Sequence, residues 1–194
     1  MAKDVGIVDY GVGNLRSIYN ALSHLGASPH LVRRPEDLGV FDRLVLPGVG
    51  AFKTAMASLK NIGMDSALAQ YVTSGHPVLG ICLGMQLFMN TSYEFLETKG
   101  LGFIDGDVVS INANGNNLMK LPSIGWYKLV KKKEDNIFRQ ISNDQWLYFV
   151  HSFMVRCKNL EDIMASYKLG TVEITCVIKK NNTKTITRIM TIIK

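Results

Sequence analysis

The sequence lacks the features that would mark a membrane protein, a secreted disulfide scaffold or a metal site. No apolar run approaches the roughly 20 residues of a membrane-spanning helix, and residues 1–4 lead directly into an expected strand rather than a signal peptide. The three cysteines, Cys82, Cys157 and Cys176, are odd in number and widely spaced. They form neither a disulfide framework nor a zinc pattern, so we expect a cytoplasmic protein.

Acidic residues are missing from the end of the chain, and this locates the net charge of +6. From Ile174 onward there are five basic residues and no acidic one, so the rest of the chain is nearly neutral. The same tail has no aromatic residue, whereas a nucleic-acid surface combines a basic stripe with aromatic side chains. The charge therefore gives little support to a nucleic-acid role.

The remaining composition is that of an ordinary globular protein. A chain of 194 residues with 47% hydrophobic and 20% charged residues can bury a substantial core. No linker or internal repeat divides it. We therefore expect a single domain over residues 1–194.

Strands and helices alternate in the first half of the chain. This βαβα order predicts an α/β fold with a doubly wound, mostly parallel sheet, helices on both faces, and ligands at the carboxyl ends of the strands. The second half favours strands. Strands are expected at 5–9, 28–32, 43–46, 78–81, 103–111, 126–130, 147–150, 162–167 and 171–178, and helices at about 15–25, 51–59 and 64–74.

The most informative segment is Pro77–Gln86, in which Cys82 stands between Gly80 and Gly84. A short apolar strand enters this G-x-C-x-G motif, and a helix-like run, Met85–Met89, follows it. The motif is the thiol counterpart of the nucleophile elbow, in which glycines permit a tight strand-to-helix turn. A helix N-terminus favours the thiolate, so the motif predicts nucleophilic attack on an acyl carbon.

A second glycine-rich turn, Pro47–Gly50, directly follows another expected strand. Taken alone, this turn is typical of an ordinary connection between a strand and a helix. Beside the elbow at Cys82, we interpret Gly48, Val49 and Gly50 as an oxyanion hole, because glycines leave backbone N–H groups free to point into a site.

These motifs in combination resemble class I glutamine amidotransferases, which implies a flavodoxin-like fold. The resemblance is closest to the glutaminase subunits of imidazole glycerol phosphate synthase and covers roughly residues 4–180. The segments that carry it are Asp9–Leu15, Leu46–Phe52, Gly80–Gln86, Gly125–Trp126 and Tyr148–Ser152.

The resemblance implies an activity and a partner. Glutamine would be hydrolysed to glutamate and ammonia, and the ammonia would pass to a TIM-barrel cyclase that makes imidazole glycerol phosphate in histidine biosynthesis. No cofactor and no metal is implied. Cys82 would be the nucleophile beside the oxyanion hole at Gly48, Val49 and Gly50. The other implied residues are Gln86, Glu94, Ser152 and Phe153 as glutamine contacts, and Tyr10, Asn14 and Trp126 on the side facing the cyclase.

The C-terminus departs from the family pattern. The family completes its catalytic triad with a His-Pro-Glu motif, at the place where this chain reads Thr183–Lys194. No histidine follows His151, and no His-x-Glu occurs anywhere. His151 is a poor substitute for the base, because its motif already has a different place beside the glutamine pocket. We hypothesise a frameshift or truncation shortly after Asn182, with the loss of the group that moves protons for the thiol.

Three functions therefore remain open. The first is the glutaminase subunit just described. The second is a sibling amidotransferase that supplies ammonia to amino-sugar synthesis for surface polysaccharides. The third is a non-catalytic subunit that docks on the cyclase and leaves it to use free ammonia. The missing histidine and glutamate favour the third function, while the intact elbow and oxyanion loop oppose it.

Overall fold

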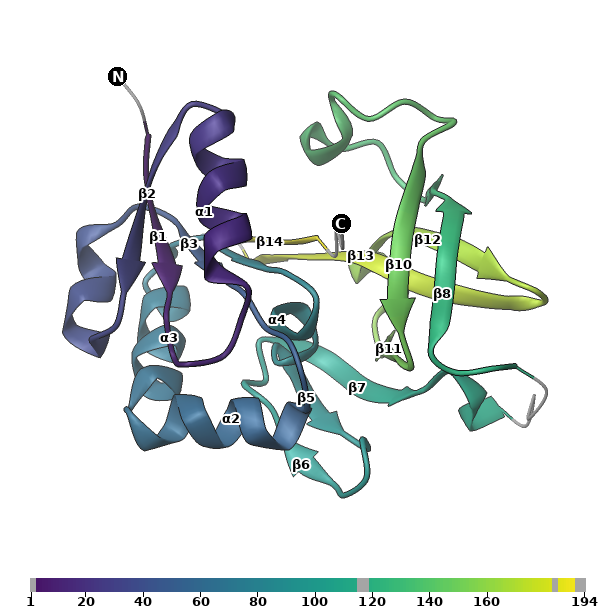
Figure 1. Ribbon diagram of the computed structural model, residues 1–194, viewed down its shortest axis with the longest axis horizontal. Coiled ribbons are helices and arrows are strands. Elements are labelled where there is room, and N and C mark those ends of the chain that lie inside the picture. The colour runs from purple at the N-terminus through teal and green to yellow at the C-terminus, as the bar shows by residue number, and fades with distance from the viewer. Residues whose placement is uncertain (1–2, 115–118, 183–184, 191–194) are drawn as a thin grey trace.

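A four-stranded parallel sheet forms the first half of the protein, and its strand order is β2-β1-β3-β4 (Figure 1). The computed structural model describes residues 3–114, 119–182 and 185–190. All of β3 and the last four residues of β1 are buried, as expected for a sheet covered on both faces. The strands are β1 (Lys3–Val8), β2 (Ala27–Val32), β3 (Leu44–Leu46) and β4 (Val78–Gly80).

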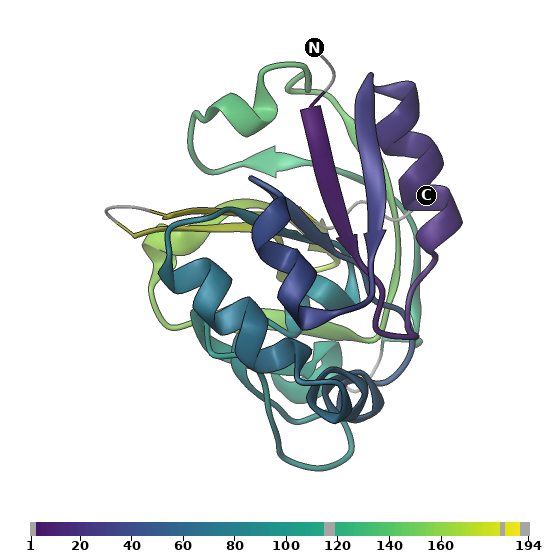
Figure 2. The same ribbon diagram turned by 90° about the vertical axis from the view of Figure 1, so that its left-hand side faces the viewer.

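Helices cover both faces of this sheet. Helix α1 (Leu15–His24) joins β1 to β2, whereas α2 (Phe52–Asn61) and α3 (Met64–Thr73) join β3 to β4. The chain moves in opposite directions across the sheet in these two connections, so right-handed crossovers place α1 on one face and α2 and α3 on the other (Figure 2). The predicted doubly wound α/β fold is confirmed. Within the described ranges, no helix combines the length and apolar character needed to cross a membrane.

The second half of the protein is dominated by antiparallel strands, with β5 and β7 as a parallel pair. The strands expected there correspond to β7, β8, β10, β12 and β13, although the boundaries of β8 lie earlier in the chain than predicted. The remaining elements are α4 (Leu83–Gln86), β5 (Met89–Ser92), β6 (Thr98–Lys99), β7 (Ile104–Ser110), β8 (Ser123–Lys128), β9 (Val130–Lys131), β10 (Trp146–His151), β11 (Phe153–Cys157), β12 (Ile163–Leu169), β13 (Val172–Asn182) and β14 (Thr185–Met190).

One predicted element is wrong. The run Met85–Met89 was expected to be helical, but α4 ends at Gln86 after one turn and Met89 begins β5. Met89 is fully buried and pairs with Ile104 of β7. Tertiary pairing therefore overrides a local pattern that is too short to decide between helix and strand.

The described part of the chain ends in the antiparallel hairpin β13–β14. Strand β14 lies beside β4, the strand that leads into the Cys82 turn, and touches α3. Of the segment that departs from the family pattern, residues 185–190 form this strand, and residues 183–184 and 191–194 lie outside the described part of the chain. The frameshift hypothesis stays a prediction.

Among the residues that the structure describes, two clusters of buried apolar side chains stabilise the protein. The larger lies between the parallel sheet and its helices, and includes Phe52, Leu59 and Phe88. The second lies among β8, β10, β12 and β13, where the ring of Tyr167 stacks on Phe149 with centroids 4.3 Å apart. The single domain over residues 1–194 stays a prediction.

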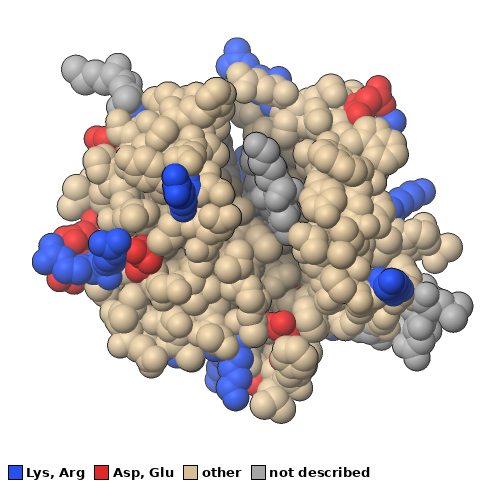
Figure 3. All heavy atoms as spheres, viewed as in Figure 1, with Lys and Arg blue, Asp and Glu red and all other residues tan. Residues whose placement is uncertain are grey.

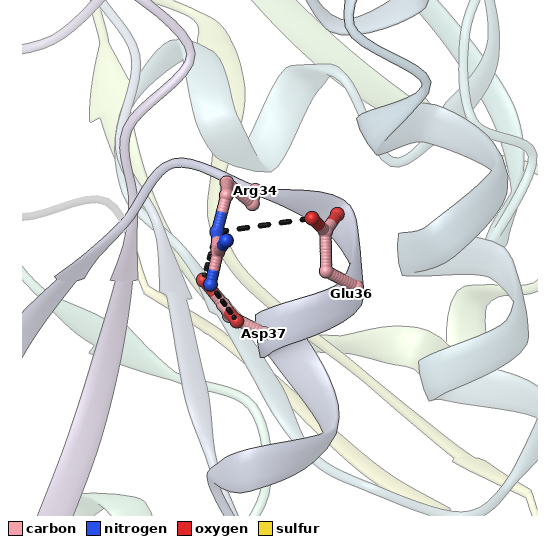
Figure 4. Close-up of polar contacts among 3 residues, drawn as sticks. All are labelled: Arg34, Glu36 and Asp37. Atoms are coloured by element: carbon pink, nitrogen blue, oxygen red, sulfur yellow. Dashed lines mark hydrogen bonds and ion pairs between the residues drawn. The ribbon is translucent and has the colours of Figure 1, made fainter.

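Charged side chains gather at the edges of the molecule in Figure 3, whereas the front surface is largely uncharged. One exposed charged cluster lies in the connection between β2 and β3 (Figure 4). Arg34 donates from Nε and Nη2 to the two carboxylate oxygens of Asp37 at 2.8 and 2.9 Å, and Nε lies 3.7 Å from Glu36. The hydrogen bond to Asp37 raises the pKa of Arg34. Because these ion pairs at the start of the 3-10 helix Pro35–Val40 are exposed to solvent, they add little stability.

The closest backbone approach next to the Cys82 turn gives a stability prediction. A Cβ on Gly84 would lie 1.9 Å from the carbonyl oxygen of Leu46, whereas a Cβ on Gly39 would meet nothing within 4 Å. We expect Gly84→Ala to lower the free energy of unfolding by about 3 kcal/mol or more and Gly39→Ala to change it by less than about 1 kcal/mol. Urea unfolding followed by circular dichroism measures both. Similar small losses in the two variants would contradict the tight contact.

Candidate active site

Cys82 occupies the turn between β4 and α4 in a strained backbone conformation. Its φ is 59° and its ψ is −118°, which costs a residue other than glycine about 1–3 kcal/mol. The turn is held by the N–H of Ile81, which donates to the carbonyl of Leu46, and by the N–H of Met85, which donates to the carbonyl of Cys82, both at 3.0 Å. Strain that is maintained by the surrounding structure is the geometry of a nucleophile elbow.

The glycines around Cys82 are required by close packing. A Cβ on Gly80 would lie 2.6 Å from the ring of Phe88, and a Cβ on Gly48 would lie 2.8 Å from the backbone nitrogen of Gly84. Gly48 belongs to the loop after β3, so this loop rests directly on the elbow. The structure thus brings together the two glycine-rich motifs that the sequence singled out.

The loop after β3 is anchored at its start. Tyr10 donates from its hydroxyl to the carbonyl of Pro47 at 2.8 Å. Burial raises the pKa of Tyr10 well above its ordinary value, and the neighbouring Cys82 adds to the shift. Gly50 has a φ of 89°, which glycine adopts without strain, and the side chain of Val49 is half exposed. The assignment of this loop as the oxyanion hole stays a prediction.

Strands β10 and β11 supply the opposite wall of the site. The side-chain amide of Gln86 donates to the carbonyl of Phe153 at 3.4 Å, and His151 Nδ1 lies 2.7 Å from the same carbonyl. These three residues and Cys82 line one pocket. The pocket is completed by Met85, Phe149, Met154, Val155, Thr175 and Cys176.

Glu94 and Ser152 are not among the residues that line this pocket. The carboxylate of Glu94 accepts a hydrogen bond from the N–H of Phe52 at 2.6 Å, and so caps the start of α2. Ser152 lies between β10 and β11, where its carbonyl accepts a hydrogen bond from the N–H of Ile111 at 3.0 Å. Their predicted contact with glutamine stays a prediction. Nothing in the sequence signalled the capping contact, because the two residues are far apart along the chain.

The predicted partner-facing residues take three different positions. Tyr10 is 5% exposed and bonded to Pro47, so its side chain belongs to the interior and not to a partner surface, contrary to the prediction. The side chain of Asn14 caps α1 by accepting a hydrogen bond from the N–H of Ser17 at 3.3 Å. Trp126 is 64% exposed on β8 and is available for contact.

The protonation of Cys82 differs from the sequence-based expectation. Burial raises the pKa of the Cys82 thiol, and the backbone hydrogen bond with Leu83 lowers it by less. Helix α4 is only one turn long, so its N-terminus does not outweigh the loss of hydration. At neutral pH the thiol keeps its proton, and nucleophilic attack needs a group that accepts it.

Four histidines occur in the chain, and only His151 shares the pocket with Cys82. Both of its ring nitrogens are in hydrogen bonds, with the carbonyl of Phe153 and, at 2.6 Å, with the hydroxyl of Tyr167. It is therefore not free to act as a base for the thiol. The other three, His24, His30 and His76, lie on α1, on β2 and just before β4.

The family model of class I glutamine amidotransferases matches residues 6–187. The chain belongs to this family. It is 41% identical over 167 residues to imidazole glycerol phosphate synthase subunit HisH of Wolinella succinogenes, which covers 86% of this chain and 82% of that protein. It is 43% identical over 187 residues to imidazole glycerol phosphate synthase subunit HisH 1 of Legionella pneumophila (strain Lens), and this match covers 93% of this chain and 88% of that protein.

The solved structure of PurLQS from Thermotoga maritima shows the same fold. It superposes with a TM-score of 0.71 over 97% of this chain and 86% of that chain, at 18% identity. The class I glutamine amidotransferase resemblance that the motifs carried is thus confirmed in both family and fold.

The three thiols of this amidotransferase differ in exposure, which gives a labelling prediction. Cys82 is partly exposed, while Cys157 and Cys176 are buried, and burial raises the pKa of each of these two to about 12. We expect iodoacetamide to modify Cys82 first, slowly near about pH 7 and faster as the pH rises, because only the thiolate reacts. Mass spectrometry of digests locates the label, and Cys82→Ala should lose it. A rate that is fast and independent of pH near neutrality would mean that the pKa of Cys82 is lowered rather than raised.

Proposed function

We propose that this chain is the glutaminase subunit of an imidazole glycerol phosphate synthase, which releases ammonia from glutamine and passes it to a cyclase subunit. The observation that carries the proposal is the strained Cys82 turn with the Gly48 loop packed on it. Relatives that share about two fifths of its residues bear the name HisH. We assign this function to the cytoplasm, where its three free thiols stay reduced.

The geometry supports an acyl-transfer mechanism. The Sγ of Cys82 attacks the side-chain amide carbon of glutamine, and the negative oxygen that forms is stabilised by backbone N–H groups of the elbow and of Gly48–Gly50. The carbon–nitrogen bond then breaks, and the thiol proton leaves with the nitrogen as ammonia. Water attacks the thioester, glutamate is released, and the thiol regains its proton. Gln86 lies in the same pocket, with its amide turned to the carbonyl of Phe153.

Proton transfer is the step for which the residues that line the Cys82 pocket offer no free group. The thiol of Cys82 is protonated, and both nitrogens of His151 are already bonded. The positions 183–194, where the family has its histidine and glutamate, carry neither residue. These observations favour, as a second candidate, a subunit that docks on the cyclase and turns glutamine over very slowly by itself.

Glutamate release by the purified chain, with its cyclase subunit present, tests the proposed function. The informative comparison is a chimera in which residues 183–194 are replaced by the C-terminal segment of the Wolinella succinogenes HisH subunit. We expect the chimera to turn over glutamine at least about 10³-fold faster than the unaltered chain, because the triad acts as a unit. Cys82→Ala should abolish turnover in the chimera. Turnover by the unaltered chain at the rate of the chimera would mean that another group supplies the base, and no turnover by the chimera would refute the proposed site.

We further propose that the cyclase docks on the outer face of the β8–β10 ribbon. These two antiparallel strands present alternate residues outward, and their paired positions Trp126–Tyr148 and Ile124–Val150 are apolar. Ile124, Trp126 and Val150 are 57%, 64% and 37% exposed. The rings of Trp126 and Tyr148 lie 5.6 Å apart. An exposed aromatic patch of this kind is typical of an interaction surface.

Substitution of Trp126 tests this docking surface. We expect Trp126→Ala to weaken binding of the cyclase about 30-fold, the effect of losing a central aromatic side chain. Val40→Ala is the matched control. Val40 is 76% exposed and ends the 3-10 helix Pro35–Val40, which follows β2, and β2 lies at the opposite end of the molecule from the ribbon (Figure 1). Calorimetry with the purified cyclase measures both variants. Equal affinities for Trp126→Ala and the unaltered chain would place the interface elsewhere.

A further inference from the structure

His151 is the histidine that lines the pocket, and its ring is held from two sides. Nδ1 lies 2.7 Å from the carbonyl oxygen of Phe153, and Nε2 lies 2.6 Å from the hydroxyl of Tyr167. Burial lowers the pKa of His151, and the hydrogen bond to Phe153 opposes this shift. The imidazole is therefore neutral at neutral pH.

The two hydrogen bonds determine where the proton of the neutral ring lies. A carbonyl oxygen only accepts hydrogen bonds, so the Nδ1 of His151 must carry the proton and donate it. Nε2 is then an acceptor, and the Tyr167 hydroxyl must donate to it. The Nε2 lone pair, which could otherwise accept the proton of the Cys82 thiol, is occupied by this hydrogen bond.

The carbonyl that His151 holds also forms the far wall of the site. The oxygen of Phe153 accepts a second hydrogen bond from the side-chain amide of Gln86, which lies on α4 one turn after Cys82. The orientation of this carbonyl thus decides where the Gln86 amide lies.

The support behind His151 is rigid. Tyr167 is fully buried on β12, and its ring stacks between Phe149 and Tyr127 with centroid distances of 4.3 and 4.6 Å. Packed rings leave the Tyr167 hydroxyl little freedom, so the direction of its hydrogen bond to His151 is fixed.

We propose that His151 is a positioning residue of the glutamine pocket: through its Nδ1–H it holds the carbonyl of Phe153 against the amide of Gln86, with Tyr167 fixing the tautomer. The assignment rests on the proposed function, since it gives glutamine as the occupant of the pocket. This role explains why His151 lines the same pocket as Cys82 although it takes no proton from the Cys82 thiol.

Two variants separate positioning from a general structural role. In His151→Asn the amide nitrogen stands at the place of Nδ1 and can still donate to Phe153. In His151→Gln the terminal amide stands at the place of Nε2, so the contact with Tyr167 is kept and that with Phe153 is lost. Both remove the ring, so a residue that only fills space would respond alike to the two changes. His24→Gln is the control, because His24 is exposed at the end of α1.

Glutamine binding is measured by calorimetry in the full chain carrying Cys82→Ala, which prevents turnover. We expect His151→Gln to weaken glutamine binding about tenfold, as the loss of one buried hydrogen bond would. The loss of affinity in His151→Asn should be smaller than this by a factor of at least about three. Tyr167→Phe should fall between them, and His24→Gln should bind as the parent does. Equal losses for His151→Asn and His151→Gln, or no loss in either, overturn the proposal.

Crystal structures of the two variants keep this test separate from that of the proposed function. We expect the Gln86 amide to stay on the carbonyl of Phe153 in His151→Asn and to leave it in His151→Gln. If no variant binds glutamine, the proposed function fails, and the position of Gln86 still decides the role of His151. Nitrogen NMR of the parent should show the proton on Nδ1, and a proton on Nε2 would refute the assignment.

Discussion

The close approach of the carboxyl ends of β3 and β4 is the constraint on which the site depends. The carbonyl of Leu46 leaves no room for a Cβ on Gly84. In the same way, the backbone of Gly84 leaves no room for a Cβ on Gly48, in the loop after β3. Within this contact Cys82 takes a positive φ, and hydrogen bonds on both sides of the turn hold it there. The proposed nucleophile and the proposed oxyanion loop are therefore one backbone unit, formed without any histidine or glutamate.

The backbone turn is encoded by local residues, whereas the side chains around it come from distant strands, and this difference explains which parts of the site could be predicted from the sequence. Glycine spacing reports steric crowding directly, so the turns at Gly48 and Gly84 and the alternation of strands and helices around them were visible in the residues alone. The direction of the Cys82 pKa was not, because hydration of the thiol depends on side chains from β10, β11 and β13 that the fold brings over it.

The predictions that the structure contradicts fail for the same reason, because contacts between distant parts of the chain decide the outcome. Met85–Met89 has a local pattern that allows a helix, and only the pairing of Met89 with Ile104 makes its end a strand. Tyr10 was expected on the partner-facing side because the family resemblance implied it, yet its hydroxyl reaches the carbonyl of Pro47, 37 residues away. Contacts between residues so distant along the chain leave no local signature in a single sequence.

The β8–β10 ribbon connects the proposed docking face to the pocket through the alternation of its side chains. Trp126 and Tyr148 point outward, while their neighbours Tyr127 and Phe149 point inward and clamp the ring of Tyr167. Successive residues of a strand face opposite sides, so the outward and inward side chains share one backbone. His151 ends the same strand, β10, and holds the carbonyl of Phe153 at the pocket wall. A partner that fixes the outer face of the ribbon therefore also fixes the backbone from which His151 reaches the site.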